Sequence, residues 1–476
     1  MERADTALTD VAAPADAPGD NVDALSPSTS PSPSRTIEAQ VARIARAIAI
    51  IDRLISEQLD AVLHGSAFQR LEALWRATEW LATSMAGDAG LRLRILDVRW
   101  NELSRDLERA MGFDQSLLFD KIYSEEFGSP GGEPFGMLVA DHAFWHRPGK
   151  VDDVSTIAGL AEVAAAAFCP VVLGIDPRML GLDSFTEIDL RQDLSGSLSG
   201  SEFARLDRVR DLPDSRFIAA VMPRLLMRQP YKGRMMPKLG FVYDERVRSA
   251  DDLCWAAAGF ALAQVAARAQ RTHRWPAALR GALSESEGGI VDTPERFYLP
   301  SDCAGVVPRF PTENAISEEQ EVAINAAGFM CLRQLHLTGD AAFLNMPTLH
   351  RPPDYDGEAA RMNAKMGAML NYILCVSRFA HYVKVIARDW VGKYAEAYQC
   401  ERLLQDWLGN YVTGNDDASP EMRVRYPLRE ARVRVAELAG QPGAFNCEIA
   451  IRPHYQLDQI ASEFRLTTTI GRTVTA

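Results

Sequence analysis

The chain has 476 residues, 47% of them hydrophobic and 24% charged, a composition typical of a globular protein with two or three domains or layers. Its 64 acidic residues outnumber its 51 basic residues, and the net charge of -13 argues against a nucleic-acid partner because it would repel phosphates. No run of about 18 apolar residues could span a bilayer, and the N-terminus lacks a signal-peptide pattern. The seven scattered cysteines form no C-x-x-C pair, which predicts reduced thiols in a cytoplasmic protein without membrane insertion.

The first 34 residues differ in composition from the rest of the chain. Residues 1–34 contain no aromatic residue, are rich in Pro, Ser, Ala and Asp, and carry six acids against the single Arg3. Such a segment cannot bury enough apolar surface to offset the entropy lost on ordering. The sequence therefore predicts a disordered tail at 1–34.

Residues 35–86 form a predicted helical segment with an unusually regular apolar stripe. The first helix is expected to begin at Thr36, a plausible N-cap, and a second helix to follow the break at Gly65. Apolar residues recur at alternating spacings of four and three, a heptad seam: Ile37, Val41, Ile44, Ile48, Ile51 and Ile55. Two interpretations have equal weight, because such a stripe could cover the core of its own domain or pack against a helix of a partner.

The region 87–420 alternates between strand-like and helix-like patterns, which predicts a layered, mixed α/β (α+β) core of two sub-layers. Strands are expected at 91–98, 136–141, 170–176 and 217–223. Helices are expected at 101–110, 157–168, 254–271 and 361–398, with a polar surface excursion at 191–211 and a Gly/Pro-rich stretch at 280–311.

The C-terminal region, 421–476, returns to strand patterns. Runs at 431–438 and 445–453 are separated by the turn signal Gly440-Gln441-Pro442-Gly443, and a further run lies at 464–470. The first two runs predict a β-hairpin.

One stretch, LCVSRFAHYVKVIARDW at 374–390, contains the three residue types of a serine hydrolase. Ser377 and His381 are four residues apart and share a helix face, but Asp389 lies about 12 Å further along the axis at 1.5 Å per residue. The geometry therefore excludes a triad, and no G-x-S-x-G motif is present. A stripe of apolar residues from Met362 to Trp390, spaced four and three, favours burial of this helix instead.

Other candidate sites are also better explained by structure than by chemistry. His142 and His146 have the i, i+4 spacing of a zinc pair, but no H-E-x-x-H motif is present. The loop GSPGGEPFG at 128–136 matches no phosphate-binding motif, which favours a turn. A basic cluster is compatible with a solvated strand face or with a charged protein partner: Arg423, Arg425, Arg429, Arg432 and Arg434. We therefore predict no catalytic residue, no metal and no cofactor.

Several long motifs resemble one family. They include FQRLEALWRATEWL, DQSLLFDKIYSEEFGSPGGEPFGMLVADHAF, DSRFIAAVMPRLLMRQPY, SRFAHYVKVIARDWVGKY and DDASPEMRVRYPLREARVRV. Read in order from about Phe68 to about Leu466, they resemble the large subunit of the type VI secretion contractile sheath, a phage-tail-sheath-like family. Within the helix signature, the matching residues are Ser377, Arg378, Phe379 and His381.

The resemblance implies a structural subunit and not an enzyme. In that family, the large subunit forms a heterodimer with a small sheath subunit and polymerises with neighbouring copies around an inner tube. The sheath stands in the cytoplasm on a baseplate anchored at the inner membrane, and contraction drives the tube with its effectors outward. The Ile seam would then pack on the small subunit, at Ile37, Val41, Ile44, Ile48, Ile51 and Ile55.

The C-terminal strands would be shared between neighbouring subunits, because the runs ARVRV and FNCEIAIRP are expected to offer unpaired edges. The residues concerned are Val433, Val435, Phe445, Ile449 and Ile451. An AAA+ recycling ATPase is a further partner of the family, but the tail replaces the helical segment that it recognises in several members. Alternatives are a divergent accessory paralogue, the sheath of another contractile injection device, or, less favoured, a serine hydrolase.

Overall fold

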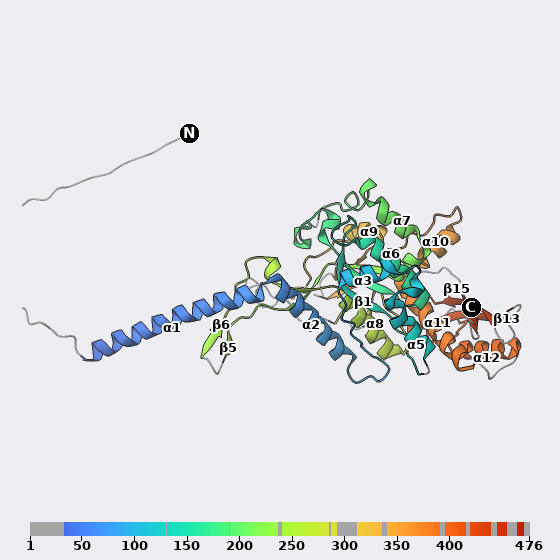
Figure 1. Cartoon of the computed structure of the whole chain (residues 1–476), viewed down its shortest axis with the longest axis horizontal. Coiled ribbons are helices and arrows are strands. Elements are labelled where there is room, and N and C mark those ends of the chain that lie inside the picture. Colours follow the sequence, from blue (N-terminus) through green and yellow to red (C-terminus); the bar gives the residue numbers. More distant parts are fainter. Residues whose placement is uncertain are drawn as a thin grey trace, which may run out of the picture.

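The computed structural model describes residues 33–476 except 130, 190, 237–239, 285–286, 293–311, 336–339, 391–395, 416–418, 439–444, 455–463 and 471–476. The predicted tail lies outside these residues apart from Pro33 and Ser34, which already belong to the first helix. Most of the Gly/Pro-rich stretch and the turn at 440–443 also lie outside them. A long helix, α1, extends away from a body in which helices surround a small sheet, with a second sheet at the C-terminal end (Figure 1).

The described helices are α1 (Pro33–Leu63), α2 (Ser66–Met85), α3 (Trp100–Arg109), α4 (Leu117–Phe119), α5 (Glu125–Gly128), α6 (Asp153–Ala167), α7 (Ala204–Asp211), α8 (Gly259–His273), α9 (Glu318–Ala326), α10 (Glu358–Met366), α11 (Leu370–Trp390), α12 (Ala397–Gly409) and α13 (Pro420–Arg425). The described strands are β1 (Leu138–Phe144), β2 (Val171–Ile175), β3 (Ile218–Met222), β4 (Leu225–Arg228), β5 (Arg234–Met236), β6 (Phe241–Tyr243), β7 (Cys254–Ala256), β8 (Ala282–Ser284), β9 (Glu287–Gly288), β10 (Met330–Cys331), β11 (Arg333–Gln334), β12 (Ala341–Ala342), β13 (Leu428–Glu437), β14 (Phe445–Pro453) and β15 (Phe464–Ile470).

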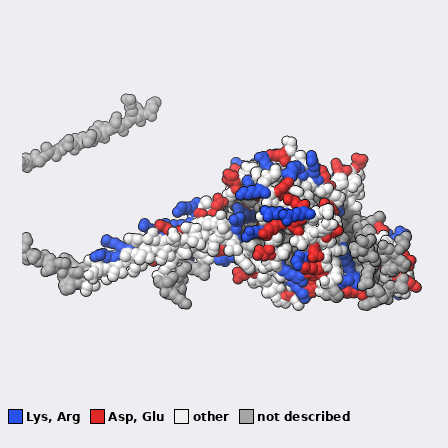
Figure 2. Space-filling model, in the orientation of Figure 1, with Lys and Arg blue, Asp and Glu red and all other residues white. Residues whose placement is uncertain are grey.

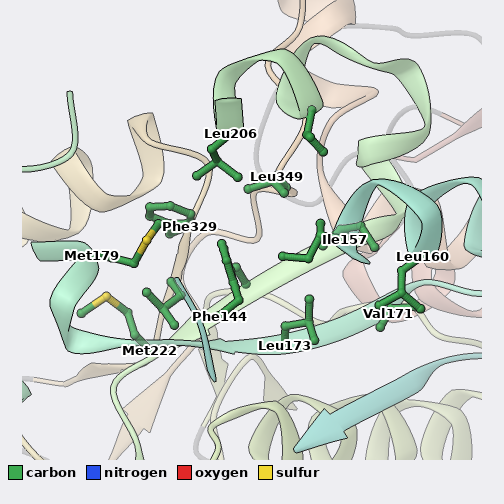
Figure 3. Packing of buried hydrophobic residues seen from close by; sticks show 14 of the residues in the cluster. Phe144, Ile157, Leu160, Val171, Leu173, Met179, Leu206, Met222, Phe329 and Leu349 are labelled. Atoms are coloured by element: carbon green, nitrogen blue, oxygen red, sulfur yellow. The ribbon is translucent and has the colours of Figure 1, made fainter. Parts of the chain in front are cut away.

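The central sheet has the order β1-β2-β3-β10 and is parallel throughout. Every residue of β2 and β3 is buried, as expected for apolar runs that are covered on both faces of a parallel sheet. Residues such as Val171 and Leu173 pack with α6 on one face (Figure 3), while the alternate residue Val172 packs with α8 and α2 on the other. The strands expected at 170–176 and 217–223 are therefore confirmed as β2 and β3, and a helix, α6, lies between β1 and β2 as expected.

A separate cluster of buried hydrophobic residues joins the C-terminal sheet to the helices that precede it. The sheet has the antiparallel order β13-β14-β15, and the predicted hairpin is confirmed by nine paired positions between β13 and β14. The inner face of this sheet packs against α11 and α12, with Phe379 of α11 and Leu404 of α12 fully buried beside Ile449.

Several expected elements differ from the structure in their bounds, among them the helix expected at 157–168, which is α6 (Asp153–Ala167), and the strand expected at 136–141, which is β1 (Leu138–Phe144). The first helix begins at Pro33 and not after Thr36, because proline fits the first helical turn, where an N–H is not needed. The helix expected at 254–271 begins only at Gly259, since Cys254–Ala256 pairs with β4 as a strand. The long pattern at 361–398 is divided near Gly367, and its second interruption, 391–395, lies outside the described residues.

The strand expected at 91–98 is not formed within this chain. Residues 91–99 have neither helical nor strand assignment, although their sequence LRLRILDV alternates as a strand does. Strand pattern alone is insufficient, because a strand needs a neighbour with matching hydrogen bonds, and no described strand of the chain supplies one here.

We expect Leu173→Ala in β2 to lower the free energy of unfolding by about 2–5 kcal/mol, because this fully buried side chain would leave a cavity between the sheet and α6. Chemical denaturation of the isolated chain measures this change. Met111→Ala is a matched control, since Met111 is 94% exposed, and equal losses in the two variants would contradict the assigned core.

Candidate assembly surfaces

The apolar seam of α1 faces solvent along most of the helix. All six residues are exposed, with values from 61% for Ile44 to 41% for Ile55. The helix touches the body only near its C-terminal end, as Figures 1 and 2 show. The seam therefore does not pack on the core of its own domain, which was one of the two interpretations of the sequence. Six large side chains in one exposed stripe are instead typical of a surface that another helix covers.

A second exposed stripe lies on α2. Phe68, Leu71 and Trp75 are 40%, 53% and 60% exposed, while Ala73 and Ala77 on the other face are buried against α8. Unlike α1, this helix has a covered face and an uncovered apolar face. Its outward stripe was not singled out from the sequence, because the buried alanines and the exposed large residues have the same helical period.

Buried polar groups hold the C-terminal end of α1 on the body. The Tyr243 hydroxyl donates to Asp60 Oδ1 at 2.6 Å, and His64 Nε2 lies 3.1 Å from Glu245 Oε1. Burial and the hydrogen bond to Asp60 raise the pKa of Tyr243, so it remains a donor. The root of α1, defined as Asp60, His64, Tyr243 and Glu245, is therefore fixed by directed hydrogen bonds.

The charge at this root is balanced by one buried arginine. Arg228 Nε donates to Glu72 Oε1 of α2 at 2.8 Å, and the Arg228 guanidinium also pairs with Glu245. Burial opposes ionisation of Arg228 and of Glu245. Hydrogen bonds from Arg228 and from the Tyr231 N–H nevertheless hold the pKa of Glu245 below its usual value. The network therefore joins α1, α2 and β4 through the ion pairs and hydrogen bonds of Arg228 and Glu245.

The C-terminal sheet is less open than its sequence predicts. The run FNCEIAIRP, β14, is the central strand and pairs with β13 on one side and β15 on the other, so the expectation that it offers an unpaired edge is wrong for this chain. The outer edge of β13 is also occupied, because the Val433 N–H donates to Gln405 and the Val435 N–H donates to Glu401, both of α12.

The side chains predicted for strand sharing lie mainly inside the molecule. Phe445, Ile449, Ile451 and Val435 are buried against α11 and α12, and Val433 is partly buried. They therefore hold the sheet on its own body. The remaining edge belongs to β15, which has no second strand neighbour within the described residues.

The signature residues of α11 form no catalytic site. Ser377 and His381 are buried, and no hydrogen bond joins them, while Asp389 is an exposed partner of Arg388. The ring of Phe379 packs on Trp275 with centroids 4.1 Å apart. Arg378 lies 4.6 Å above the ring of Tyr382. These contacts explain the regular helix by packing, as predicted.

His381 is neutral because it is buried in apolar surroundings. Its Nε2–H donates to the Ala167 carbonyl at 3.0 Å, and its Nδ1 has no hydrogen-bond partner. Burial lowers the pKa of His381 to about 3. A neutral imidazole without a hydroxyl or carboxylate partner cannot activate Ser377 as a nucleophile.

The two histidines of the possible zinc pair are engaged separately. His142 Nε2 lies 3.1 Å from Asp153 Oδ1 and its ring stacks on Trp100, whereas His146 is buried against Phe203. Across the described part of the chain, no group of three His, Cys, Asp or Glu residues is arranged to hold a metal ion. The same residues include no helix that is long and apolar enough to cross a membrane.

The glycine-rich loop at 128–136 forms a turn, as predicted. Gly131 has a φ of +80°, and a Cβ on Gly132 would lie 2.1 Å from the Glu126 carbonyl oxygen, so the turn requires glycine there. Arg388 of α11 donates to the Ser129 carbonyl at 2.9 Å and thereby closes the end of α5.

The basic cluster is spread over two elements. Arg432 and Arg434 are exposed on the outer face of β13, where Arg432 pairs with Glu430. Arg423 and Arg425 lie in α13. For Arg432 and Arg434, the structure therefore agrees with the interpretation of a solvated strand face.

The exposed apolar stripes of α1 and α2 are surfaces typical of a subunit that assembles with other chains. Two family models match the chain: the EvpB/VC_A0108 tail sheath N-terminal domain over residues 45–350, and the EvpB/VC_A0108 tail sheath gpW/gp25-like domain over 359–470. The chain is 36% identical over 424 residues to the type VI secretion system sheath protein TssC1 of Pseudomonas aeruginosa, covering 88% of this chain and 84% of that protein. The chain belongs to the family of type VI secretion sheath proteins, which are structural and not enzymes.

Two solved structures of contractile devices show a distant likeness. One is the anti-feeding prophage baseplate, with a TM-score of 0.38, 9% identity and coverage of 81% of this chain and 85% of that chain. The other is the contracted helical sheath of the anti-feeding prophage, with a TM-score of 0.34, 10% identity and coverage of 67% of each chain. The family assignment rests on the family models and the curated relative.

Breaking the root of α1 is expected to destabilise the chain strongly. Arg228→Met would leave Glu245 buried without its arginine and Glu72 with only the partly exposed Arg76, which costs about 3–5 kcal/mol in free energy of unfolding. Arg53→Met is the control, because its pair with Glu57 is exposed and contributes less than about 1 kcal/mol. Chemical denaturation measures both, and a similar small loss in both would contradict a buried network.

Acid is expected to destabilise the chain through His381. The folded pKa of about 3 lies below the ordinary 6.5, so the unfolded chain takes up the proton first and stability falls as pH drops from 6.5 towards 3. Between these two pH values, His381 lowers the free energy of unfolding by about 1.4 kcal/mol for each pH unit of acidification. Denaturation curves at several pH values should show a flatter dependence for His381→Asn than for the natural chain, and parallel curves would contradict the assignment.

Proposed function

We propose that this chain is the large subunit of a type VI secretion sheath and pairs through α1 with a small sheath subunit. The pairs polymerise with neighbouring copies around an inner tube, on a baseplate, and contract to drive the tube outward. The observation that carries the pairing is the exposed seam of α1, with Ile48 and Ile51 each 53% exposed. Covering such a stripe with a partner helix would remove apolar surface from water that the chain itself leaves exposed.

The heptad spacing supports a helix as the occupant of the seam. Alternating steps of four and three keep the stripe on one side of a helix over several turns, which suits knobs-into-holes packing. Arg43, Arg46 and Arg53 are exposed away from the six seam positions, while Ile50 and Leu54 are exposed as well and widen the apolar surface of α1. A partner helix with a matching apolar stripe would complete the pair.

Contact between neighbouring copies is proposed for the C-terminal sheet. Support comes from β15, whose outer edge has no strand neighbour among the described residues. An added strand would continue the sheet by main-chain hydrogen bonds. Because Val435, Ile449 and Ile451 anchor the sheet on α11 and α12, such a link would transmit force to the body. A recycling ATPase remains a prediction from the family resemblance.

Charge in the seam is expected to prevent pairing without unfolding the chain. Ile48→Asp would place a carboxylate where the partner helix packs, and we expect at least a tenfold loss of affinity for the small sheath subunit. The isolated variant should keep its unfolding temperature, because Ile48 has no cover in the lone chain. Co-purification and thermal unfolding measure these two effects.

Arg46→Asp on the polar side of α1 is the matched control and should pair normally. Co-expression with the small sheath subunit, followed by negative-stain electron microscopy, tests the wider proposal. Tubules with the natural chain and none with Ile48→Asp are expected. An Ile48→Asp chain that still pairs, or a natural chain that forms neither heterodimer nor tubule, would refute the proposal.

A further inference from the structure

We propose that Lys384 of α11 is a modification site, a reactive amine that accepts an acyl group from an acyl phosphate. Its side chain lies in the lysine cage, defined as Lys384 together with the rings of Tyr123, Phe127 and Phe168. The cage belongs to the body of the chain, so the inference does not depend on how α1 pairs with another subunit.

Three aromatic faces surround the amine of the lysine cage. Its Nζ lies 4.7 Å from the ring centroid of Tyr123, 5.3 Å from that of Phe127 and 4.7 Å from that of Phe168. The same Nζ donates a hydrogen bond to the Tyr123 hydroxyl at 3.2 Å. All four cage residues are partly exposed, and α11 lies beside α5 (Figure 1). The cage is therefore a feature of the surface and not of the apolar core.

The backbone that carries two of the rings departs from regular helix. Tyr123 lies in a π-helical turn, Asp120–Ser124, and such turns occur frequently at functional sites. Phe168 ends α6 with a φ of 52°, in the left-handed region that a bulky residue rarely adopts. Strained backbone of this kind clusters at binding and catalytic sites. Both rings are thus held over the amine by unusual local structure.

Among the described residues, no carboxylate compensates the charge of the caged amine. Burial raises the pKa of Tyr123, so its hydroxyl stays neutral and cannot act as a counter-ion. Glu126, the buried carboxylate of α5, is paired with Arg94. On α11 itself, His381 is neutral, and Arg388 is a second cation that donates to the carbonyls at the end of α5.

An ammonium group without a counter-ion loses its proton more easily in the cage than in water. Burial lowers the pKa of Lys384 to about 8, although the rings favour the charged form. At pH 7, about a tenth of this amine is then uncharged, against well under a thousandth of an ordinary lysine with a pKa of about 10.4. Because only the uncharged amine is a nucleophile, the cage activates Lys384.

The acylation step balances with the acyl phosphate as the only added reagent. The Nζ lone pair attacks the acyl carbonyl carbon, and the bond from that carbon to the phosphate oxygen breaks. The phosphate leaves with the electron pair of this bond and takes up the proton that the nitrogen gives up. The products are an amide on Lys384, which carries no charge, and hydrogen phosphate.

Charge and size favour an acyl phosphate as the donor. Its phosphate is an anion, and Lys384 and Arg388 place two cations one turn apart on the same face of α11. A small donor also suits a cage that is only partly exposed, whereas a bulky donor would meet the surrounding rings.

Incubation of the full chain with acetyl phosphate, followed by peptide mass spectrometry, tests the inference. At pH 7.5 we expect Lys384 to be acetylated about tenfold faster than Lys121, although Lys121 is the more exposed of the two. Lys121 is the matched internal reference, because it lies in the same turn as Tyr123 and its hydrogen bond and ion pair with Glu125 raise its pKa. Equal or slower acetylation of Lys384 would overturn the inference.

The pH dependence of acetylation gives a readout that exposure alone would not change. The rate at Lys384 should level off above about pH 8 to 9, where its amine is uncharged. The rate at Lys121 should continue to rise to about pH 10, because its pKa is raised. Rates that rise in parallel at the two lysines over this range would overturn the inference.

Phe168→Ala removes one ring and opens the cage to water. Its expected effect is to raise the pKa of Lys384 and to slow acetylation at pH 7.5 by about threefold or more. Phe113→Ala is the control, because Phe113 is an exposed ring that stacks on Phe119 and not on the amine, and its rate should equal that of the natural chain.

Thermal unfolding shows whether both variants fold. Faster acetylation of Lys384 in folded Phe168→Ala would mean that the cage only shields the amine, and would overturn the inference. If Phe168→Ala does not fold, the pH dependence in the natural chain decides the question by itself.

Discussion

The ion pairs of Arg228 with Glu72 and Glu245 are the constraint on which the shape of the chain depends. Hydrophobic burial holds little of helix α1, because its apolar seam faces away from the body. Its attachment therefore comes from directed contacts at the root, such as the bond from Tyr243 to Asp60. Since hydrogen bonds fix direction better than apolar packing does, the seam is held in a defined orientation.

The two ends of the chain differ in how far their apolar surfaces and strand edges are covered. At the C-terminal end, Gln405 and Glu401 of α12 accept or donate along the outer edge of β13, and the inner face of the sheet is buried on α11. At the N-terminal end, the seam of α1, the outer stripe of α2 and residues 91–98 all leave apolar groups in water. The C-terminal end therefore covers its own apolar surface, whereas the N-terminal end leaves its apolar surface exposed.

The α11 helix shows how packing can resemble chemistry. Ser377 and His381 have the right residue types, but burial lowers the pKa of His381 to about 3, and its one hydrogen bond goes to a backbone carbonyl. The helix packs against the central sheet through Leu370 and Leu374 and against the C-terminal sheet through Cys375 and Phe379. Residues that suggested a hydrolase therefore lie in a helix that connects the two sheets.

The sequence by itself determined the features that depend on local periodicity: the heptad seam of α1, the apolar runs of β2 and β3, the stripe of α11 and the C-terminal hairpin. Only the tertiary structure decided which of these are covered, because burial depends on residues distant in the chain. It left Ile48 exposed, made β14 a central strand, turned Cys254–Ala256 into a strand beside β4 and left 91–98 without a hydrogen-bonded strand among the described residues. An alternating or heptad pattern shows which side of an element is apolar, but not whether its own chain or another provides the cover.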